Sequence, residues 1–388
     1  MRIALITPAF PPSTGGVEIH VARIASGLTS LGVEVEVFTG SRDRCTGPGS
    51  VEYRDGLTVH RFPAWRTAII SCCPRLLFRT MHLDSTFDVI HVHSYHSSAA
   101  LTALVGRTRA VVFTPHFHGS GHTRLARLLH TVYRRFSSAL FTSSSAVICV
   151  SDAERSLVRT SFPFLTTPMT VIPNGVDAVA ITAAAPYPDE SSTLVFHGRL
   201  EPYKHVDRVI AAMTELPQSV QLVVIGDGSA RGALASESLR LGLGDRVRFL
   251  GQVDTPTLHR WLRTARVCVS LSEHEAFGIA PLEAACAGSR IVLSDIPAHR
   301  EIAQHYIGGG VALVPSSADV TALARAITSQ LSATYTRPTS IPDWTDVAEE
   351  TLLVYRQAVY RHAVHRQATH CHPLKHPPKH LGRGHSAH

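Results

Sequence analysis

Short β-branched segments alternate with helical patterns along most of the chain, and they do so in two separate series. The first series predicts strands at Arg2 to Thr7, Val33 to Thr39, Asp88 to His93, Ala110 to Thr114 and Ala146 to Val150. The second predicts strands at Thr193 to Phe196, Gln221 to Ile225, Val247 to Leu250, Val267 to Leu271 and Arg290 to Leu293. Such alternation is typical of parallel sheets covered by helices on both faces. We therefore expect an α/β fold with two doubly wound, Rossmann-like domains that face each other.

The length of 388 residues also suits two domains, because ordinary single domains are shorter. We expect a first domain over residues 1–180, a linker rich in Ala, Pro and Ser over 181–192, and a second domain over 193–342. A final helix is predicted over 343–361, with apolar side chains on one side. Residues 362–388 hold eight of the 24 histidines and several prolines, which predicts a disordered, His-rich basic tail.

The net charge of +7 is concentrated near that tail, because residues 361–388 contain five Lys or Arg and no Asp or Glu. No apolar run reaches the roughly 18 residues that would span a bilayer. Met1 leads directly into a strand pattern rather than a signal peptide, and the seven cysteines lack paired metal-ligand spacing. We therefore expect a cytoplasmic protein with reduced thiols, no structural metal and no nucleic acid partner.

Lys204 is the only lysine in the first 360 residues of a chain that otherwise uses arginine for its cations. It ends the segment Gly198 to Lys204, which also contains Arg199. A lysine carries a compact charge on a flexible stem, whereas arginine presents a planar fork, so a retained lysine suits one oxygen between phosphates. The alternative is a surface lysine retained by chance. We interpret the segment as a phosphate contact.

Two glutamates, Glu275 and Glu283, follow with seven residues between them. Pro281 suits the first position of a helix, where no amide donor is missed. This would place Glu275 in the loop before the helix and Glu283 in its first turn. The amides of Gly278 and Ile279 would point outward from the helix N-terminus, where free N–H groups and the helix dipole favour a phosphate.

These residues are where the chain resembles the retaining GT-B glycosyltransferases of family 4, which use nucleotide-sugar donors. The resemblance covers nearly the whole chain before the tail. Its motifs occur in order: Gly15 to Glu18, Val171 to Asp177, Arg199, Lys204, and Glu275 to Glu283. One such motif is weak, whereas five in order are specific. The chain departs from the family pattern at His205 and Ala276, two positions where Gly is common.

The resemblance implies a role for each charged residue of these motifs. Arg199 and Lys204 would contact the donor pyrophosphate. Glu275 would bind hydroxyls of the donor sugar, and Glu283 would hold the ribose hydroxyls. All four are expected at the cleft between the domains, because ligands of open α/β sheets bind beyond the carboxyl ends of the strands.

The uncharged residues of the motifs have implied roles as well. The amides of Phe277, Gly278 and Ile279 would line the sugar and the β-phosphate. Gly16 would approach the donor from the N-terminal domain. The family's final helix crosses back to that domain, so the predicted helix after Pro342 is expected to do the same.

The resemblance also implies a mechanism without a side-chain nucleophile, in which the leaving phosphate accepts the proton of the acceptor hydroxyl. Glu275 and Glu283 are then used for hydroxyl binding and do not form a carboxylate pair of the glycoside-hydrolase type. We expect transfer of a hexosyl-type sugar with retention, from a UDP- or GDP-sugar with UDP slightly preferred, and no cofactor or metal. The acceptor could be a lipid, a glycan, or a small cyclitol or natural product.

Several other interpretations compete with this one. The glycines at 15–16 and 226–228 lack the dinucleotide-binding spacing, and no lysine follows them as in a phosphate-binding loop. A phosphorylase or a sugar-nucleotide epimerase on the same fold is an alternative. Against the phosphorylase, only Lys204 is available before the tail to carry pyridoxal phosphate. A non-catalytic nucleotide-sugar-binding partner subunit is another, and it would be expected to lose part of the motif set.

The N-terminal domain has a basic segment, because no acidic residue occurs between Asp88 and Asp152. Residues 121–137 predict a helix with one apolar face and four arginines opposite, namely Arg124, Arg127, Arg134 and Arg135. Such a face would attract an anionic or lipid-linked acceptor, or give peripheral contact with the inner face of a membrane. The alternative is a solvated face that pairs with acids elsewhere.

Histidines gather in the same domain, at His91, His93, His96, His116, His118 and His122. No carboxylate accompanies them, so we expect polar contacts in the cleft rather than a metal site. The step Thr114-Pro115-His116 resembles the family position whose His lies near the donor sugar and the acceptor. We therefore include His116 among the catalytic residues, as a group that positions its neighbours rather than as a general base.

Overall fold

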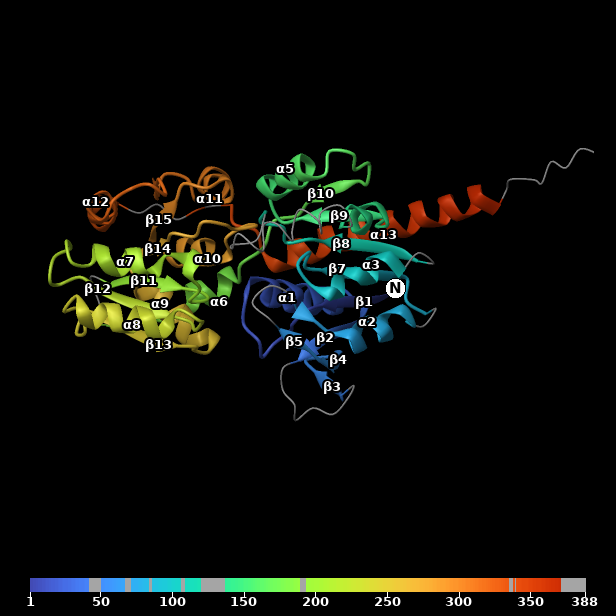
Figure 1. The fold of residues 1–388 in the computed structure, drawn as a ribbon, viewed down its shortest axis with the longest axis horizontal. Coiled ribbons are helices and arrows are strands. Elements are labelled where there is room, and N and C mark those ends of the chain that lie inside the picture. The colour runs from blue at the N-terminus through green and yellow to red at the C-terminus, as the bar shows by residue number, and fades with distance from the viewer. Residues whose placement is uncertain are drawn as a thin grey trace, which may run out of the picture.

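Two α/β lobes lie side by side, one built from each half of the chain (Figure 1). The computed structural model describes residues 1–41, 50–66, 71–83, 86–105, 109–119, 137–188, 193–334, 338 and 340–370. Strands β1 to β10 belong to the N-terminal lobe and strands β11 to β16 to the C-terminal lobe. The prediction of two doubly wound domains is confirmed.

The N-terminal sheet has eight strands in the order β10-β9-β8-β7-β1-β2-β4-β3, all parallel to their neighbours except β3. Its strands are β1 (Arg2–Thr7), β2 (Glu34–Ser41), β3 (Ser50–Arg54), β4 (Leu57–Pro63), β7 (Val89–His93), β8 (Ala110–Thr114), β9 (Ala146–Cys149) and β10 (Met169–Val171). A separate antiparallel pair joins β5 (Trp65–Arg66) to β6 (Ser71–Cys72). The helices of this lobe are α1 (Gly16–Ser30), α2 (Pro74–Met81), η1 (Ser98–Leu101), α3 (Thr102–Val105) and α5 (Asp152–Ser161).

The C-terminal sheet is parallel throughout, with six strands in the order β13-β12-β11-β14-β15-β16. These are β11 (Thr193–His197), β12 (Gln221–Ile225), β13 (Val247–Gly251), β14 (Val267–Ser270), β15 (Arg290–Ser294) and β16 (Val311–Val314). The remaining helices are α6 (Ala178–Ala183), η2 (Pro202–Lys204), α7 (Val206–Ala212), α8 (Arg231–Arg240), α9 (Thr255–Thr264), α10 (Ile279–Ala287), α11 (Pro297–Ile302), the π-helical turn η3 (Ala303–Ile307), α12 (Val320–Ser332) and α13 (Trp344–His370).

Apolar side chains fill both faces of each sheet. Along β1, Ile3 and Leu5 belong to the core beneath α1 and α13, whereas Ala4 and Ile6 belong to the core on the opposite face. Successive side chains of a strand point to opposite faces, so a strand that is covered twice is apolar at every position. This is why the strands could be located in the sequence as continuous apolar segments.

The ten predicted strands are all present, with ends within two residues of the prediction. Strand β4 escaped prediction because its sequence contains His60 and Arg61. Both side chains are satisfied inside the sheet, His60 by Glu36 at 2.7 Å and Arg61 by Glu52 at 2.9 Å. Polar side chains paired across neighbouring strands leave no apolar pattern to detect.

Helix α13 returns to the N-terminal lobe, as expected, but it is longer than predicted. Its residues Val347 and Tyr355 pack in the core of that lobe, and in Figure 1 the helix lies along the right-hand lobe. It has 27 residues and ends at His370 rather than near Tyr360, so residues 362–370 are helical and not part of a disordered tail. No proline or glycine occurs before Pro373 to stop it. Within the described ranges no helix is long and apolar enough to cross a bilayer.

Three predictions concern segments that the structure describes only in part or not at all. The arginine helix at Arg124 to Arg135 lies outside the described residues, as do His122 and the tail at 371–388. The segment between the sheets is described up to residue 188, and it begins with helix α6, which packs on α9 and α10. The predicted linker therefore starts inside a short helix.

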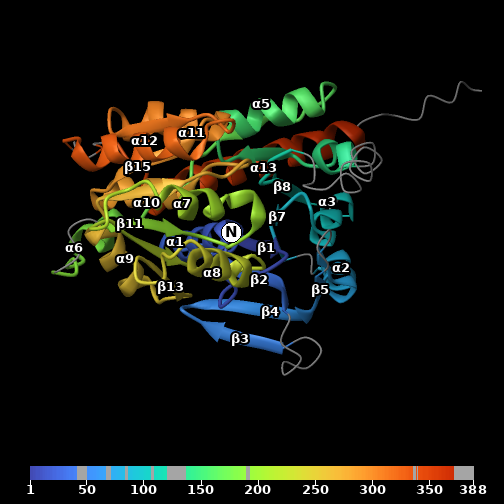
Figure 2. The same ribbon diagram turned by 60° about the vertical axis from the view of Figure 1, so that its left-hand side comes forward.

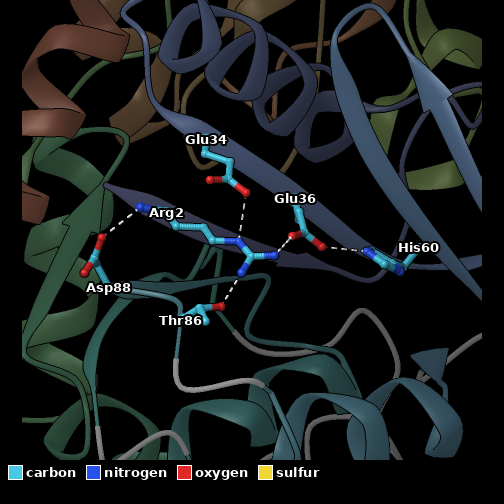
Figure 3. A network of polar contacts seen from close by, with 6 residues as sticks. All are labelled: Arg2, Glu34, Glu36, His60, Thr86 and Asp88. Atoms are coloured by element: carbon cyan, nitrogen blue, oxygen red, sulfur yellow. Dashed lines mark hydrogen bonds and ion pairs between the residues drawn. The ribbon is translucent and has the colours of Figure 1, made fainter.

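Arg2 joins three neighbouring segments at the end of the N-terminal sheet where β1 begins (Figure 3). Its guanidinium lies 2.9 Å from Glu34 and 2.5 Å from Glu36, and its backbone N–H donates to Asp88 at 2.8 Å. Burial would raise the pKa of Glu36, but hydrogen bonds from Arg2 and His60 outweigh it and lower that pKa. We assign this network to sheet stability, because it lies away from the carboxyl ends of the strands.

Candidate functional site

Lys204 and Glu275, which are far apart in the sequence, form an ion pair in the C-terminal lobe. Lys204 Nζ lies 2.5 Å from Glu275 Oε1, and the two side chains are 15% and 20% exposed. Burial alone would raise the pKa of Glu275, but the Lys204 ammonium outweighs it and lowers that pKa to about 2. Burial would lower the pKa of Lys204, and Glu275 reverses this too. Both groups are therefore charged at neutral pH.

Arg199 lies close to this pair and donates to the Tyr203 hydroxyl at 3.1 Å. Burial would lower the pKa of Arg199, but Tyr203 and nearby carboxylates, including Glu18 of α1 and Glu275, raise it. Glu18 comes from the N-terminal lobe, so the site draws charges from both lobes. Two cations, Arg199 and Lys204, thus lie near three carboxylates, Glu201 after β11, Glu18 at the start of α1 and Glu275 before α10.

Glycines fix the loop that carries these cations. A Cβ on Gly226 would lie 2.0 Å from the Gly198 carbonyl oxygen, and a Cβ on Gly228 would lie 2.4 Å from the Leu200 carbonyl oxygen. The loops after β11 and β12 therefore contact each other through their backbones, which no side chain would allow. The loop shape that places Arg199 depends on this close approach.

Helix α10 begins two residues earlier than predicted. It starts at Ile279 with Gly278 before it, so Pro281 is its third residue and Glu283 its fifth, beyond the first turn. Pro281 is tolerated there because the first four amides of a helix have no partner within the helix. Gly278 has a φ of 122°, and a Cβ would lie 2.6 Å from Ile302 Cδ1. The helix N-terminus still follows the Glu275 loop, as expected.

Glu283 lies apart from the Lys204–Glu275 pair and beside His197. His197 Nε2 lies 3.5 Å from Glu283 and donates to the Ala280 carbonyl at 3.1 Å. Burial raises the pKa of Glu283 to about 7, with Arg23 opposing the shift and Asp177 adding to it. Burial lowers the pKa of His197 to about 4, and the Lys204 charge adds to that shift. His197 was not predicted as a site residue, although it stands directly before Gly198 at the end of a strand.

Three buried histidines, His20, His93 and His116, gather in the N-terminal lobe. Their ring centroids lie 4.9 Å (His20 and His116), 5.5 Å (His20 and His93) and 5.8 Å (His93 and His116) apart. His20 Nδ1 donates to Asn174 Oδ1 at 2.6 Å. Burial lowers the pKa of all three, that of His20 to about 4, so the rings are neutral at pH 7. His20 was missed because no local pattern links it to histidines on distant strands.

The other histidines have different surroundings. His91 is held by the Tyr355 hydroxyl at 2.7 Å and Thr114 Oγ1 at 2.8 Å, so it ties α13 to the N-terminal sheet. His96 and His118 lie with their rings 5.2 Å apart, outside the trio. His116 has a φ of 47°, an uncommon value for a residue with a side chain, so its loop is closely constrained.

The trio is the group in the described part of the chain that could hold a metal ion. Its ligand atoms lie within 4.8 Å of one another, whereas neighbouring ligands of a tetrahedral zinc lie about 3.3 Å apart. Among the residues described, neither nitrogen of His93 nor Nε2 of His116 has a hydrogen-bond partner. That the reaction needs no metal stays a prediction.

Gly16 is the first residue of α1, one turn before His20. A Cβ on Gly16 would meet no other atom within 4 Å, so the protein itself imposes no steric need for glycine there. Phe277 is buried in a core of the C-terminal lobe and lies near Tyr306. Gly16 and His116 thus lie in the N-terminal lobe, whereas the other predicted residues lie after β11 and in or before α10 in the C-terminal lobe.

Two family models match the chain in succession. The model described as "Glycosyltransferase Family 4" matches residues 14–179, and the one described as "Glycosyl transferases group 1" matches residues 180–338. The phosphatidyl-myo-inositol mannosyltransferase of Mycolicibacterium smegmatis is 30% identical over 387 residues, covering 92% of this chain and 93% of that protein. The glycogen synthase of Mycobacterium tuberculosis is 29% identical over 400 residues, covering 92% and 95%.

Solved structures show the same fold at lower identity. Sucrose-phosphate synthase from Thermosynechococcus elongatus superposes with a TM-score of 0.72 at 22% identity, covering 92% of this chain and 98% of that chain. Anabaena HepE in complex with UDP and glucose superposes with a TM-score of 0.67 at 20% identity, covering 95% and 99%. The chain is therefore a GT-B glycosyltransferase and belongs to glycosyltransferase family 4.

Proposed function

We propose that the protein transfers a hexosyl-type sugar from a nucleoside diphosphate sugar to a hydroxyl acceptor with retention of configuration. The observation that carries this proposal is the buried Lys204–Glu275 pair, with Arg199 beside it. A diphosphate needs more than one cation, and a sugar needs an ionised carboxylate to accept from its hydroxyls. The site offers both within one small region.

Each residue contributes through its charge and place. Arg199 and Lys204 bind the diphosphate, and the N-terminus of α10 adds its free amides at Phe277, Gly278 and Ile279. Glu275, whose pKa is about 2, stays ionised and accepts from sugar hydroxyls. A donor phosphate that approaches Lys204 competes with Glu275 for the ammonium, which frees the carboxylate for the sugar.

The nucleoside end of the donor lies further along α10. Glu283 accepts from the ribose hydroxyls. Gly16 leaves room for the donor to approach the first turn of α1, since no atom of the described residues lies within 4 Å of a Cβ built there. His116, neutral and buried, positions the donor sugar and the acceptor hydroxyl from the N-terminal lobe.

The chemistry rests on stabilising the departing diphosphate. As the bond from the anomeric carbon to the phosphate oxygen breaks, negative charge grows between Arg199, Lys204 and the helix N-terminus, where fixed donors stabilise it most. The acceptor hydroxyl attacks from the same face, and its proton goes to the leaving phosphate oxygen. No side-chain carboxylate is needed as nucleophile, because Glu275 is occupied with the hydroxyls of the donor sugar. We propose that no metal takes part.

The donor base and the acceptor are the least defined parts of the proposal. The UDP complex of HepE supports a slight preference for UDP over GDP. The mannosyltransferase relative, by its name, acts on a phosphoinositide, which supports a lipid acceptor beside glycan or cyclitol acceptors. Phe78 and Met81 on α2 and Trp65 on β5 are exposed apolar side chains that such an acceptor could contact. A lipid acceptor would bring the protein to the inner face of a membrane.

Two alternatives predict different behaviour. A non-catalytic partner subunit would bind the nucleotide without turnover, yet the full set of charged residues is present here. A phosphorylase on the same fold would need a lysine to carry its cofactor, and Lys204 is paired with Glu275. An epimerase would alter the sugar nucleotide without transferring its sugar.

The test combines nucleotide binding with turnover. UDP, GDP, ADP, dTDP and NADH are compared by thermal shift with and without chelator, and hydrolysis or transfer of the matching sugar nucleotide is then measured. A ligand at a hundredfold excess over its Kd adds roughly 2.7 kcal/mol to the free energy of unfolding. We expect a chelator-resistant shift with one nucleoside diphosphate. A shift with NADH alone would refute the proposal.

Lys204→Ala should lower kcat by about 10² to 10³, because its charge acts mainly on the departing diphosphate. Arg240→Ala serves as the matched control, since among the described residues this exposed cation pairs with Glu237 on its own helix and not with the site. Unchanged turnover in Lys204→Ala would remove that residue from the mechanism.

A further inference from the structure

Ser151, at the end of β9 in the N-terminal lobe, holds the donor loop of the C-terminal lobe. Its buried hydroxyl donates to the Ala276 carbonyl at 2.6 Å. Ala276 stands between Glu275 and Phe277, two residues of the candidate site. A single hydrogen bond from the other lobe thus fixes the backbone next to the sugar-binding carboxylate.

Glu301 of α11 reaches from the C-terminal lobe to the N-terminal lobe. Its carboxylate accepts from the backbone N–H groups of Asp152 at 2.8 Å and Ala153 at 2.7 Å, at the N-terminus of α5. Figures 1 and 2 both show α5 next to α11, although the two helices belong to different lobes. A carboxylate at this end of a helix satisfies amides that have no partner within the helix and also interacts favourably with its dipole.

Glu154, in the same turn, contacts the N-terminal lobe instead. Its backbone N–H donates to Ser151 Oγ at 2.8 Å. Glu154 as a residue is only 2% exposed. Its carboxylate accepts from the N–H of Val150 at 2.6 Å and from the N–H of Phe117. Phe117 directly follows His116, whose φ of 47° marks a constrained loop. The turn therefore contacts the His116 loop as well as the donor loop.

We propose that the turn Ser151 to Glu154 is a positioning element that sets His116 against Glu275 when the two lobes close. This rests on the proposed function, because it assigns His116 and Glu275 to the donor sugar. Ser151 and Glu154 are positioning residues, since they act on the reacting groups through backbone contacts and not directly. Glu301 holds the turn in register with the C-terminal lobe.

The contacts are local and continuous. From Glu275 the path runs through the Ala276 carbonyl, the Ser151 hydroxyl, the Glu154 backbone and carboxylate, and the Phe117 amide to His116. Val150 adds an apolar contact, because it packs in a core of the C-terminal lobe although it belongs to the N-terminal chain segment. A shift of the donor loop would therefore move the His116 loop, and an open form would lose the Ser151 and Glu301 contacts together.

The element makes a distinct prediction for kinetics. Nucleoside diphosphate binding depends on Arg199, Lys204 and Glu283, all within the C-terminal lobe, so removing the Ser151 hydroxyl should leave the Kd for UDP within about threefold. The kcat for sugar transfer should fall about tenfold, because loss of one buried hydrogen bond costs about that factor when it acts on the transition state. If the Ser151 contact were merely structural, its removal would change neither the kcat nor the coupling between Ser151 and His116.

The experiment uses the full chain and compares Ser151→Ala with Ser151→Thr, which keeps a hydroxyl at the position. We expect Ser151→Ala to lose about tenfold in kcat and Ser151→Thr to recover most of it. Glu301→Gln should lower kcat in the same way and keeps the proposal testable if Ser151→Ala fails to fold. Arg155→Ala, which removes only an exposed ion pair with Asp152 on the same helix, is the control and should stay within about twofold of the wild type.

Coupling to His116 decides between positioning and simple stabilisation. If Ser151 acts through His116, His116→Asn should cost little more in a Ser151→Ala background, so the two kcat losses will not add. Additive losses, or a Ser151→Ala enzyme with wild-type kcat, would overturn the proposal. Failure of the wild type to bind any nucleoside diphosphate would instead refute the proposed function, so the two failures are distinguishable.

Discussion

Two glutamates of the candidate site differ in charge state although both are largely buried. The ammonium of Lys204 lowers the pKa of Glu275 to about 2, whereas burial raises the pKa of Glu283 to about 7. Glu283 has only the more distant Arg23 to oppose its burial. The two carboxylates can therefore be told apart by pH, because one titrates far below neutrality and the other close to it.

The affinity for UDP should rise between pH 6 and pH 8. Ribose hydroxyls donate to an ionised Glu283, and below its pKa each pH unit weakens that interaction by up to about tenfold. In the free protein the raised pKa of Glu283 has the opposite effect, on the stability of the fold. It lowers the free energy of unfolding as the pH rises from the usual glutamate value to about 7.

Isothermal titration of UDP at pH 6, 7 and 8 measures this dependence. Glu283→Gln is the control, because it removes the carboxyl titration but leaves the titration of the nucleotide phosphate unchanged. We expect a steeper dependence in the wild type than in the variant. Equal slopes would show that Glu283 does not contact the nucleotide in its ionised form.

His205 shows why a family pattern can tolerate an exception. The residue adopts a left-handed conformation with a φ of 50°, which explains why Gly is common at this position. In this chain a histidine stands there, and its side chain is held by Glu273, whose carboxylate lies 2.8 Å from His205 Nε2. The sequence predicted the charges of the loop correctly, but the anchoring contact with Glu273 lies on another loop and leaves no local pattern.

At the scale of single elements, the start of α10 depends on Gly278. Gly278→Ala would add a side chain at a φ of 122° and place its Cβ 2.6 Å from Ile302 Cδ1. We expect a loss of about 1–3 kcal/mol in the free energy of unfolding, from backbone strain and from the contact. Urea denaturation followed by circular dichroism measures it, and the UDP-induced thermal shift should fall as well, because the helix N-terminus moves.

Gly232→Ala is the matched control for that change. Gly232 lies in the first turn of α8, has no positive φ and has nothing within 4 Å of a built Cβ. The same substitution should there stabilise the protein by about 0.5–1 kcal/mol, because alanine has the higher helix propensity. If both variants lost stability equally, the special geometry at Gly278 would not be the cause.

The elements also show which parts of the fold were readable from the sequence. Apolar strands such as β1 and β12 were predicted to the residue, because burial on both faces leaves a continuous pattern. The start of α10 was misplaced, because Pro281 is equally compatible with the first and the third position of a helix. The end of α13 was misplaced too, since composition changes after Tyr360 before any residue that stops a helix.

At the scale of the whole molecule, contacts between distant segments hold the N-terminal lobe together and join it to the C-terminal lobe. The His20–Asn174 hydrogen bond, the Arg23–Asp177 ion pair at 3.5 Å and the Glu301 contacts with α5 all join residues more than 140 positions apart. None of these pairs follows a periodic or local rule, so sequence reasoning could name the site residues on each lobe but not the contacts between them.

The crossing of two backbone segments near Gly175 sets how the lobes are joined. The Val176 N–H donates to the Pro342 carbonyl at 2.9 Å, where the chain returns to the N-terminal lobe before α13. A Cβ on Gly175 would lie 2.6 Å from the Trp344 nitrogen and 2.7 Å from the Asp343 carbonyl carbon. Gly175 has no positive φ, so alanine there would act through this contact alone and not through backbone strain.

Gly175→Ala should therefore separate the crossing segments and change the relative orientation of the lobes. UDP binding, which uses residues of the C-terminal lobe, should persist within about threefold, whereas kcat should fall about tenfold, because a small misplacement of reacting groups is costly. Small-angle scattering with and without UDP would report the changed closure. Gly309→Ala, where a Cβ meets nothing within 4 Å, is the control. A Gly175→Ala enzyme with wild-type kcat would show that closure tolerates a shift at this crossing.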